Sequence, residues 1–151
     1  MKTLNILALH GPNLNLLGRR EPERYGVTTL AAIERGLVAQ AATLHAQLTS
    51  FQSNHEGALV ERLQACLDDG TDGIIMNLAA LTHTSVALRD ALIIASCPAV
   101  EVHISNVFAR EPFRHRSLVA DICLGHVAGF GPDSYRLALD GLVAHLRRLE
   151  P

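Results

Sequence analysis

The residues best suited to acid/base chemistry lie in one apolar run, VEVHIS, in the second half of the chain. Strand alternation would put Glu101, His103 and Ser105 on one face of this run. Two residues along a strand span roughly 6.5 Å, so Glu101 can orient His103 directly or through a water molecule. A carboxylate beside a histidine fixes the tautomer of the ring and favours its protonated form, which suits a general acid. The alternative is a buried Glu–His pair with a structural role only.

A long connection near the N-terminus places a tyrosine among cations. Residues 10–26 (HGPNLNLLGRREPERYG) show little regular pattern, and 17 residues are long for a link between a strand and its helix. The neighbouring cations are Arg19, Arg20 and Arg24. Their charge favours the phenolate form of Tyr25, which would make it a usable base. A glycine stands at each end of residues 18–26, and we expect this segment to be a mobile lid. A solvated basic loop is the alternative.

Two further polar segments follow predicted strand ends. Asn77 closes one strand, and His83 stands just before the next predicted helix. Unpaired amides and the positive end of a helix dipole suit an anionic or hydroxylated ligand at such a turn. Capping explains the neighbouring threonines and serine, but it does not require His83. After the VEVHIS run come three cations that can clamp a carboxylate by bidentate hydrogen bonds: Arg110, Arg114 and Arg116.

Eight histidines raise the question of a metal site. His10, His83 and His103 stand at predicted strand ends and could converge there. Close pairs spaced HxH or HxxxH are absent, so we expect no metal ion. Surface or packing roles are expected for the others: His45, His55, His115, His126 and His145. Neither a GxGxxG nor a GxxxxGK motif is present, and we expect no nucleotide, flavin or other cofactor.

Apolar runs alternate with helical patterns, which predicts the elements that position these residues. Strands are predicted at Leu4–Leu9, Ala46–Gln52, Gly73–Leu78, Ala99–Ile104 and Ile122–Val127. Helical spacing begins at Thr28, with Thr28 or Thr29 as its cap, and returns at 56–69, at 84–96 and near Pro132. We therefore expect an α/β fold: one flavodoxin-like domain over 1–151, with a doubly wound five-stranded parallel sheet in three layers. Ligands of such sheets bind beyond the carboxyl ends of the strands, where the polar segments above begin.

The composition excludes several classes of function. Of 151 residues 48% are hydrophobic, and 13 basic and 15 acidic side chains give a net charge of −2, which argues against a nucleic-acid partner. No apolar run is long enough to span a membrane. The only lysine is Lys2, so Schiff-base catalysis is almost excluded. The odd, widely spaced cysteines fit neither disulfides nor a zinc site and favour a cytoplasmic location: Cys66, Cys97 and Cys123.

Several separate motifs follow one another over nearly the whole chain. They are GPNLNLLG with RREP and YG, QSNHEGALVERL, LTHTSVALRDA, EVHISN with AREPFRHRS, and GHVAGFGPDSYRLAL. Together they resemble type II 3-dehydroquinate dehydratase. The resemblance implies a flavodoxin-like lyase without cofactor or metal, assembled as a homo-oligomer, usually a dodecamer of four trimers. It also implies the reaction: 3-dehydroquinate loses water through an enolate-type intermediate to give 3-dehydroshikimate, in the shikimate pathway of aromatic biosynthesis or in quinate breakdown.

The resemblance also implies catalytic roles at matching positions. Tyr25 would be the base that takes the proton next to the ketone. Arg20, or the arginine before it, would hold the phenolate form. Asn13 would position a water that stabilises the enolate. His103 would protonate the departing hydroxyl, with Glu101 behind it.

Substrate-binding residues are implied in the same way. Asn77, His83 and Arg114 would bind substrate hydroxyls, and the backbone amides of Ile104 and Ser105 would hold the substrate carboxylate. Asp90 resembles a residue that reaches into the site of a neighbouring subunit. The chain departs from the family pattern around the site, without losing a catalytic residue, at Leu78, Leu81 and Leu118. These changes bear on substrate affinity and subunit packing more than on the reaction.

Two other classes of function remain open on the sequence alone. A non-catalytic flavodoxin-like module for a small anionic ligand would keep the binding residues, but it would need neither a base nor an acid. The presence of both Tyr25 and His103 therefore argues against it. A phosphate-handling hydrolase would need a phosphate-binding loop, which the chain lacks.

Overall fold

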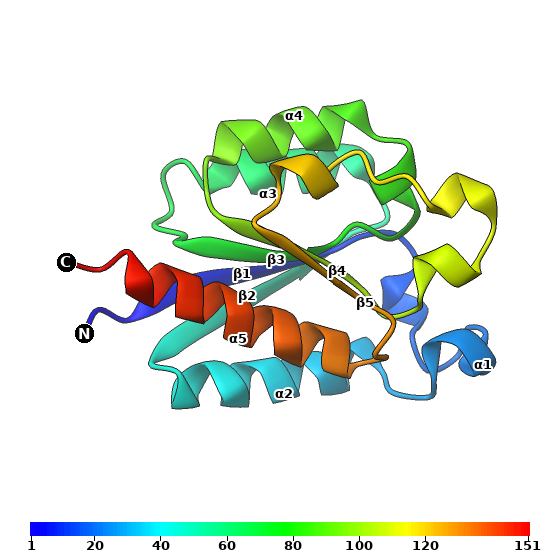
Figure 1. The fold of residues 1–151 in the computed structure, drawn as a ribbon, viewed down its shortest axis with the longest axis horizontal. Helices are drawn as coiled ribbons and strands as arrows, with labels where there is room; N and C mark the ends of the chain where they lie inside the picture. The colour runs from blue at the N-terminus through cyan, green and yellow to red at the C-terminus, as the bar shows by residue number, and fades with distance from the viewer.

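One five-stranded sheet runs through the molecule between two layers of helices (Figure 1). The computed structural model describes residues 1–151. Its strands are β1 (Leu4–His10), β2 (Ala46–Gln52), β3 (Gly73–Asn77), β4 (Ala99–His103) and β5 (Gly125–Ala128). All pairings are parallel, and the strand order is β2-β1-β3-β4-β5. The predicted doubly wound parallel sheet is confirmed.

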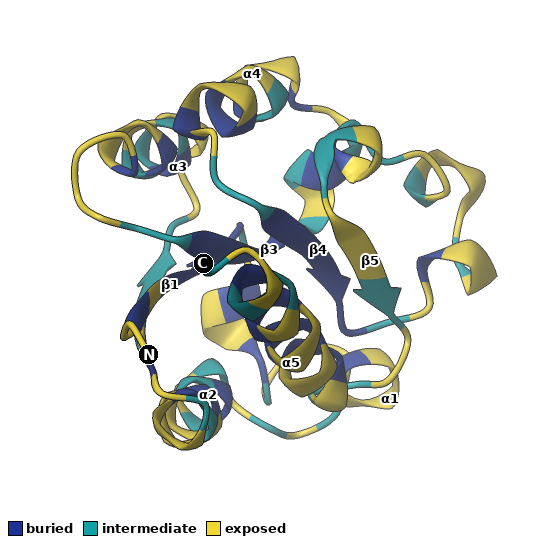
Figure 2. Cartoon of the chain, turned by 60° about the vertical axis from the view of Figure 1, so that its left-hand side comes forward, coloured by how far each residue is buried: buried dark blue, intermediate teal, exposed yellow.

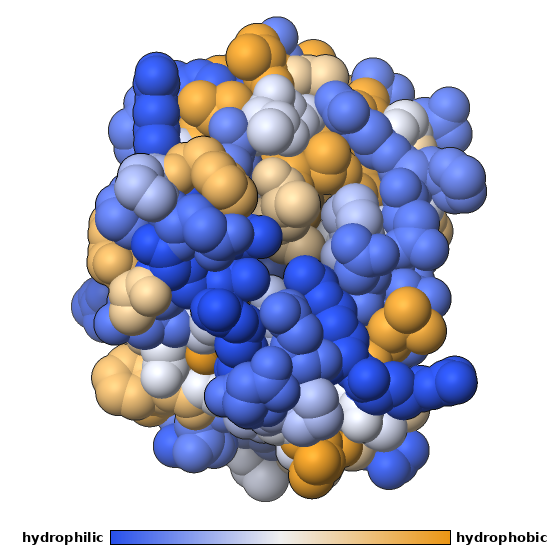
Figure 3. All heavy atoms as spheres, turned by 90° about the vertical axis from the view of Figure 1, so that its right-hand side faces the viewer, coloured by the Kyte–Doolittle hydropathy of each residue, from blue (hydrophilic) through white to orange (hydrophobic).

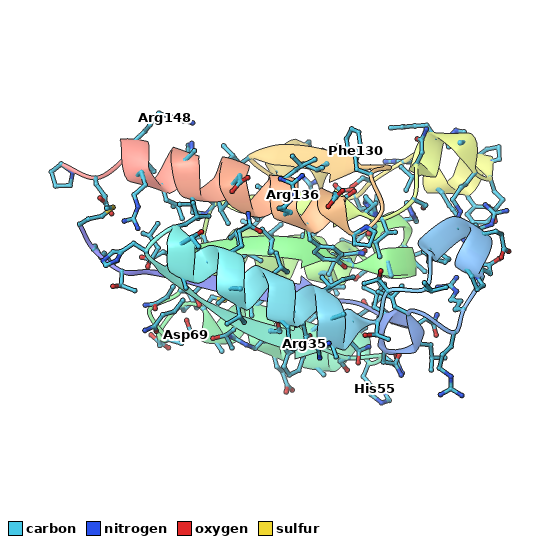
Figure 4. All side chains as sticks on the ribbon, turned by 90° about the horizontal axis from the view of Figure 1, so that it is seen from below. Arg35, His55, Asp69, Phe130, Arg136 and Arg148 are labelled. Carbon is cyan, nitrogen blue, oxygen red and sulfur yellow. The ribbon has the colours of Figure 1, made fainter.

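The helices divide evenly between the two faces of the sheet. Helices α2 (Leu30–Thr43) and α5 (Asp133–Arg148) cover one face, as seen from below in Figure 4, where Arg35 and Arg136 mark them. Helices α3 (Glu56–Ala65) and α4 (Val86–Ala95) cover the other face. The short helix α1 (Pro22–Tyr25) lies apart from both layers, at the end of the sheet where the strands finish.

Strand alternation splits the core into two. On β1, Ile6 and Ala8 pack with α2 and α5, whereas Leu7 and Leu9 pack with α3 and α4. Every residue of β3 and β4 is buried, and burying an aliphatic side chain stabilises a fold by about 1.5–3 kcal/mol. The edge strand β5 is exposed or half-buried throughout (Figure 2). The sheet therefore has a rigid centre, to which β4 belongs, and a more accessible edge.

Element boundaries differ from the predictions by more than one residue at three places. Helix α3 ends at Ala65 instead of residue 69. Helix α4 begins at Val86, because the Ser85 hydroxyl caps it by accepting from the amide of Leu88 (2.9 Å), and residues 79–83 form a 3₁₀ turn. Strand β5 begins at Gly125, after a 3₁₀ turn over residues 120–122. At α3 and β5 an apolar pattern continues into a turn, whereas at α4 the polar residues Thr84 and Ser85 precede the helix.

The amino ends of the strands lie far from α1. There the only lysine, Lys2, reaches Asp72 with an Nζ–Oδ1 distance of 2.6 Å, and its side chain is 63% exposed. All three cysteines are free, as expected. None of the helices has the length and apolar character that crossing a membrane requires.

Candidate active site

A cavity lies at the carboxyl ends of β1, β3 and β4, where ligands bind in this class of sheet. Its wall contains nine of the residues to which the family resemblance gives a role: Asn13, Arg20, Tyr25, Asn77, His83, His103, Ile104, Ser105 and Arg114. Figure 3 looks onto this end of the molecule, where hydrophilic side chains gather across the middle of the face. The fold therefore brings together segments that are up to about 100 residues apart in the sequence.

Tyr25 ends α1 and is only 8% exposed. Its hydroxyl oxygen accepts a hydrogen bond of 2.7 Å from Nη1 of Arg110. The guanidinium of Arg20 lies over the tyrosine ring, 4.7 Å from its centroid. A guanidinium bonded to the phenolic oxygen stabilises negative charge on that oxygen, which a base requires.

The arginine at this hydroxyl differs from the one expected. The resemblance assigned the phenolate to Arg20 or Arg19, whereas the sequence suggested that Arg110 helps clamp a carboxylate. Arg20 instead contacts the ring face, and Arg19 is exposed and outside the cavity wall. Arg110 bridges the Tyr25 hydroxyl and the Ser105 hydroxyl, at 2.7 and 3.3 Å. Spacing could not reveal this contact, because it joins residues 85 positions apart through two 3₁₀ turns.

Glu101 and His103 are in direct contact on β4. Nε2 of His103 lies 2.5 Å from Oε2 of Glu101, and the Ser117 hydroxyl donates to Oε1 at 2.6 Å. Burial alone would raise the pKa of Glu101, but these hydrogen bonds and the neighbouring imidazoles together lower it. Glu101 is therefore an ionised carboxylate that holds one edge of the His103 ring, and it stands behind this ring as predicted.

A second imidazole reaches the same carboxylate, and the sequence interpretation missed it. His126 was expected to have a surface or packing role. The register of β4 and β5 pairs Glu101 with His126, and its Nε2 lies 3.3 Å from Oε2 of Glu101. The rings of His103 and His126 have centroids 5.5 Å apart. Only the strand register could have revealed this contact.

Asn77 is held from behind by a buried tyrosine. Its Nδ2 donates to the Tyr135 hydroxyl at 2.9 Å, and its Oδ1 accepts from the amide of Ala79 at 3.0 Å. Tyr135 on α5 is 1% exposed, as expected of a packing residue, and its hydroxyl additionally fixes the amide of Asn77. On the far side of this hydroxyl lies Nδ1 of His10, at 3.5 Å. Burial lowers the pKa of His10 to about 4, so this ring is neutral.

The three histidines considered for a metal site do not converge. His83 and His103 stack with centroids 6.2 Å apart, but His10 faces Tyr135 and lies outside the cavity wall. Nδ1 of His83 donates to the backbone oxygen of Arg116 at 2.8 Å, and burial lowers the pKa of His83. Arg116 thus contributes its carbonyl group and not its guanidinium.

The cavity wall carries positive charge without a carboxylate. Arg20, Arg110 and Arg114 line it, and no aspartate or glutamate does. Arg114 is oriented by Glu111 outside the wall, with an Nε–Oε1 distance of 3.2 Å. Such a wall suits a small anionic ligand.

Two backbone segments complete the wall. Asn13 has left-handed backbone geometry (φ 70°), and its amide donates to Oδ1 of Asn54 at 2.9 Å, a contact that the sequence interpretation did not include. Ile104 and Ser105 follow the last residue of β4. The carbonyl of Ile104 accepts from the amide of Gly131, which ties this corner to the start of α5.

Two residues with expected or conceivable roles lie elsewhere. Asp90, on α4, is not in the cavity wall of its own chain. Lys2 lies at the opposite end of the sheet, so no lysine can reach a ligand in the cavity.

The sheet order and this site define an α/β protein of the flavodoxin-like class, with a tyrosine and a histidine in one cavity beyond the strand ends. Residues 4–143 match the Dehydroquinase class II family, and the chain belongs to that family. It is 58% identical over 140 residues to the 3-dehydroquinate dehydratase of Bordetella petrii, covering 93% of this chain and 97% of that one. The crystal structures of type II dehydroquinases from Butyrivibrio crossotus and Propionibacterium acnes have TM-scores of 0.90 and 0.89. They are 40% and 39% identical, covering 93% and 95% of this chain and 97% and 99% of theirs.

Proposed function

We propose that this chain converts 3-dehydroquinate to 3-dehydroshikimate by acid/base elimination of water. The observation that carries the proposal is that Tyr25 and His103 line one cavity, each bonded to a group of complementary charge. Elimination from a β-hydroxy ketone needs a base at the α carbon, an acid at the leaving oxygen and stabilisation of the enolate between them. Family membership supports the same reaction.

The base step falls to Tyr25. Its phenolate takes the proton next to the ketone, and the electron pair of that C–H bond becomes the enolate, whose charge lies on the former ketone oxygen. Arg110 stabilises the phenolate before the transfer through its 2.7 Å hydrogen bond. Asn13, at the mouth of the cavity, positions a water on the enolate oxygen.

The acid step falls to His103. The enolate re-forms the ketone, its electron pair makes the new C=C bond, and the C–O bond to the hydroxyl breaks. His103 gives the leaving oxygen a proton, so that water departs. Glu101 stabilises the imidazolium before this step and fixes the orientation of the ring. The tyrosine proton gained in the first step balances the histidine proton lost in the second.

The other residues of the cavity wall bind the substrate. The backbone amides of Ile104 and Ser105 hold the substrate carboxylate, while Asn77, His83 and Arg114 bind its hydroxyl groups. Tyr135 fixes the side chain of Asn77 and thereby its orientation toward the substrate. Residues 18–26 act as a lid, supported by glycines at both ends with φ of 90° and 72°, which carries Arg20 and Tyr25 over the substrate.

Assembly as a homo-oligomer, a dodecamer in the family pattern, belongs to the proposal, as does a cytoplasmic location. Helix α4 supports the assembly, because it exposes three apolar side chains: Val86, Ile93 and Ile94. The same helix carries Asp90, which does not line the cavity of its own chain. Light scattering should give a mass several times 16.3 kDa. A monomer with full activity would contradict both the assembly and the role of Asp90 in a neighbouring site.

One assay tests the reaction. The product is a conjugated enone, so purified protein mixed with 3-dehydroquinate should raise the ultraviolet absorbance with time. Treatment with borohydride during turnover should leave no adduct, because no lysine reaches the cavity. Absence of turnover in the assembled protein would refute the proposal and favour a non-catalytic binding module.

A further inference from the structure

A second cavity adjoins the proposed substrate cavity and shares four lining residues with it: His83, His103, Val107 and Arg114. Glu101, His103 and His126 line it, together with Ser117 and His115. Each of the first three offers one ligand atom, and these atoms all lie within 4.8 Å of one another. Two of the residues come from β4 and the third from β5, so the ladder between the strands fixes their relative positions.

The donor set is that of a transition-metal site. Two imidazole nitrogens and one carboxylate oxygen suit Zn²⁺, Co²⁺ or Cu²⁺, whereas Mg²⁺ and Ca²⁺ prefer oxygen ligands alone. Zn²⁺ binds nitrogen and oxygen at about 2.0–2.2 Å, so ligand atoms around a tetrahedral ion stand roughly 3.3 Å apart. Nε2 of His126 and Oε2 of Glu101 already have a separation of 3.3 Å. The His103–Glu101 contact, at 2.5 Å, has to open by less than an ångström.

The site is accessible from the edge of the sheet. The side chain of His126 is 31% exposed, whereas those of Glu101 and His103 are 2% and 6% exposed. Strand β5 has no further strand beyond it, so an ion can meet His126 first and then the buried pair.

We propose that Glu101, His103 and His126 bind one zinc-type ion per chain and that this ion inhibits the enzyme. The ion takes the place of the proton between His103 and Glu101. If His103 is neutral, this proton moves from Nε2 to Nδ1. If His103 is an imidazolium, the Nε2 proton is released to solvent. Glu101 then ligates the ion and no longer stabilises an imidazolium. The metal-bound His103 keeps only its Nδ1 proton, which is far less acidic than a proton of an imidazolium. The binding stands by itself, whereas the inhibition rests on the proposed function.

Binding is tested directly by equilibrium dialysis of the intact protein against zinc sulfate, with Co²⁺ as a spectroscopic probe. We expect one Zn²⁺ per chain, visible absorption bands for Co²⁺, and no binding of Mg²⁺. His126→Val removes a ligand from an accessible strand position and should weaken Zn²⁺ binding by ~100-fold or more, since losing even an outer-shell partner costs about 10–100-fold. His145→Gln, on the opposite face of the sheet, is the matched control and should bind as the wild type does.

The outcomes separate the two proposals. No stoichiometric Zn²⁺, or equal affinity in wild type and His126→Val, would overturn the metal site; the second result would place the ion elsewhere, for instance at Cys123. Zinc should abolish turnover in the wild type. At the same zinc concentrations, His126→Val should turn over substrate as fast as it does without metal. A metal-free protein that shows no turnover would refute the proposed function and leave the binding result intact. Zinc binding with undiminished turnover would overturn the inhibition alone.

Discussion

The two residues proposed as acid and base are held in very different ways. His103 ends a strand in which every residue is buried, and its ring is fixed by Glu101, itself fixed by Ser117. Tyr25 ends a helix of four residues outside the sheet, and one hydrogen bond and two stacked guanidiniums hold it. The proposed acid is thus part of the rigid core, and the proposed base is part of a surface segment.

The difference teaches how one site can be both precise and accessible. A ring whose proton must leave in a defined direction benefits from a strand ladder that allows little motion. A base that must also cover the substrate benefits from a segment that can move away and return. Arg110 joins the two halves, since it contacts Tyr25 and also Ser105 at the end of β4.

The largest expected effect comes from removing the base alone. Tyr25→Phe should lower turnover by about 10³-fold, because a positioned base contributes about 10²–10⁴-fold and the ring otherwise keeps its place. Product affinity, measured by calorimetry, should stay close to that of the wild type. Near-normal turnover in this variant would show that the base lies in the rigid half of the site.

The next largest loss of turnover is expected from removing Arg110, which links Tyr25 to the end of β4. Arg110→Gln removes a charge-assisted hydrogen bond of 2.7 Å and should lower turnover by about 10²-fold. Arg24→Gln is its control, since Arg24 carries the same charge, precedes Tyr25 on α1, is 44% exposed and pairs only with Glu21. This control should stay within about threefold of the wild type, as exposed pairs contribute little. Equal losses in both variants would mean that only net charge matters.

The rigid half should respond to pH through His10. The folded protein holds this ring with a pKa of about 4, below the value of 6.5 in an unfolded chain. Between these values the unfolded state binds the proton, so the free energy of unfolding falls as pH falls. From about pH 7 to about pH 5 the loss should be about 2 kcal/mol. Urea unfolding of wild type and His10→Gln at both pH values measures it, and an equally steep fall in the variant would contradict the assignment.

The smallest effects are expected from two glycine-to-alanine substitutions, one in the lid and one in the sheet. In Gly18→Ala the new Cβ would stand 2.8 Å from the carbonyl oxygen of Val27, at a φ of 90°. Strain of about 1–2 kcal/mol should lower kcat/KM by about tenfold and leave unfolding by urea nearly unchanged. In Gly73→Ala the Cβ would meet Leu142 and Leu146 at 3.0–3.1 Å. That variant should lose about 1–2 kcal/mol of unfolding free energy and keep its kcat/KM. The reverse pattern would show that the lid is no separate unit.

Local pattern was sufficient for most of the fold. The alternation of VEVHIS predicted that Glu101 and His103 share a face, and the Thr29 cap of α2 and the bounds of β2 followed from short-range signals. The edge strand was predicted too early, because its apolar run begins in a turn. Periodicity does not distinguish a residue that pairs in a sheet from one that only packs on it.

Contacts between distant segments were the part that sequence reasoning could not supply. The position of His126 depends on the register of two parallel strands, and the bond from Arg110 to Tyr25 depends on the path of two 3₁₀ turns. The hydroxyl of Tyr135 reaches Asn77 only because α5 crosses beneath β3. Each follows from tertiary packing, which no local pattern encodes. The roles assigned to the individual residues stay predictions until the variants above are measured.

The position of Lys2 gives the molecule a chemical handle. It is the only side-chain amine, it is largely exposed, and β1 separates it from the cavity by seven residues, about 23 Å of strand. Amine-directed reagents such as activated esters would therefore label the chain at the end of the sheet remote from the substrate. A dye or a solid support attached there would present every copy in the same orientation, with the reacting face outward.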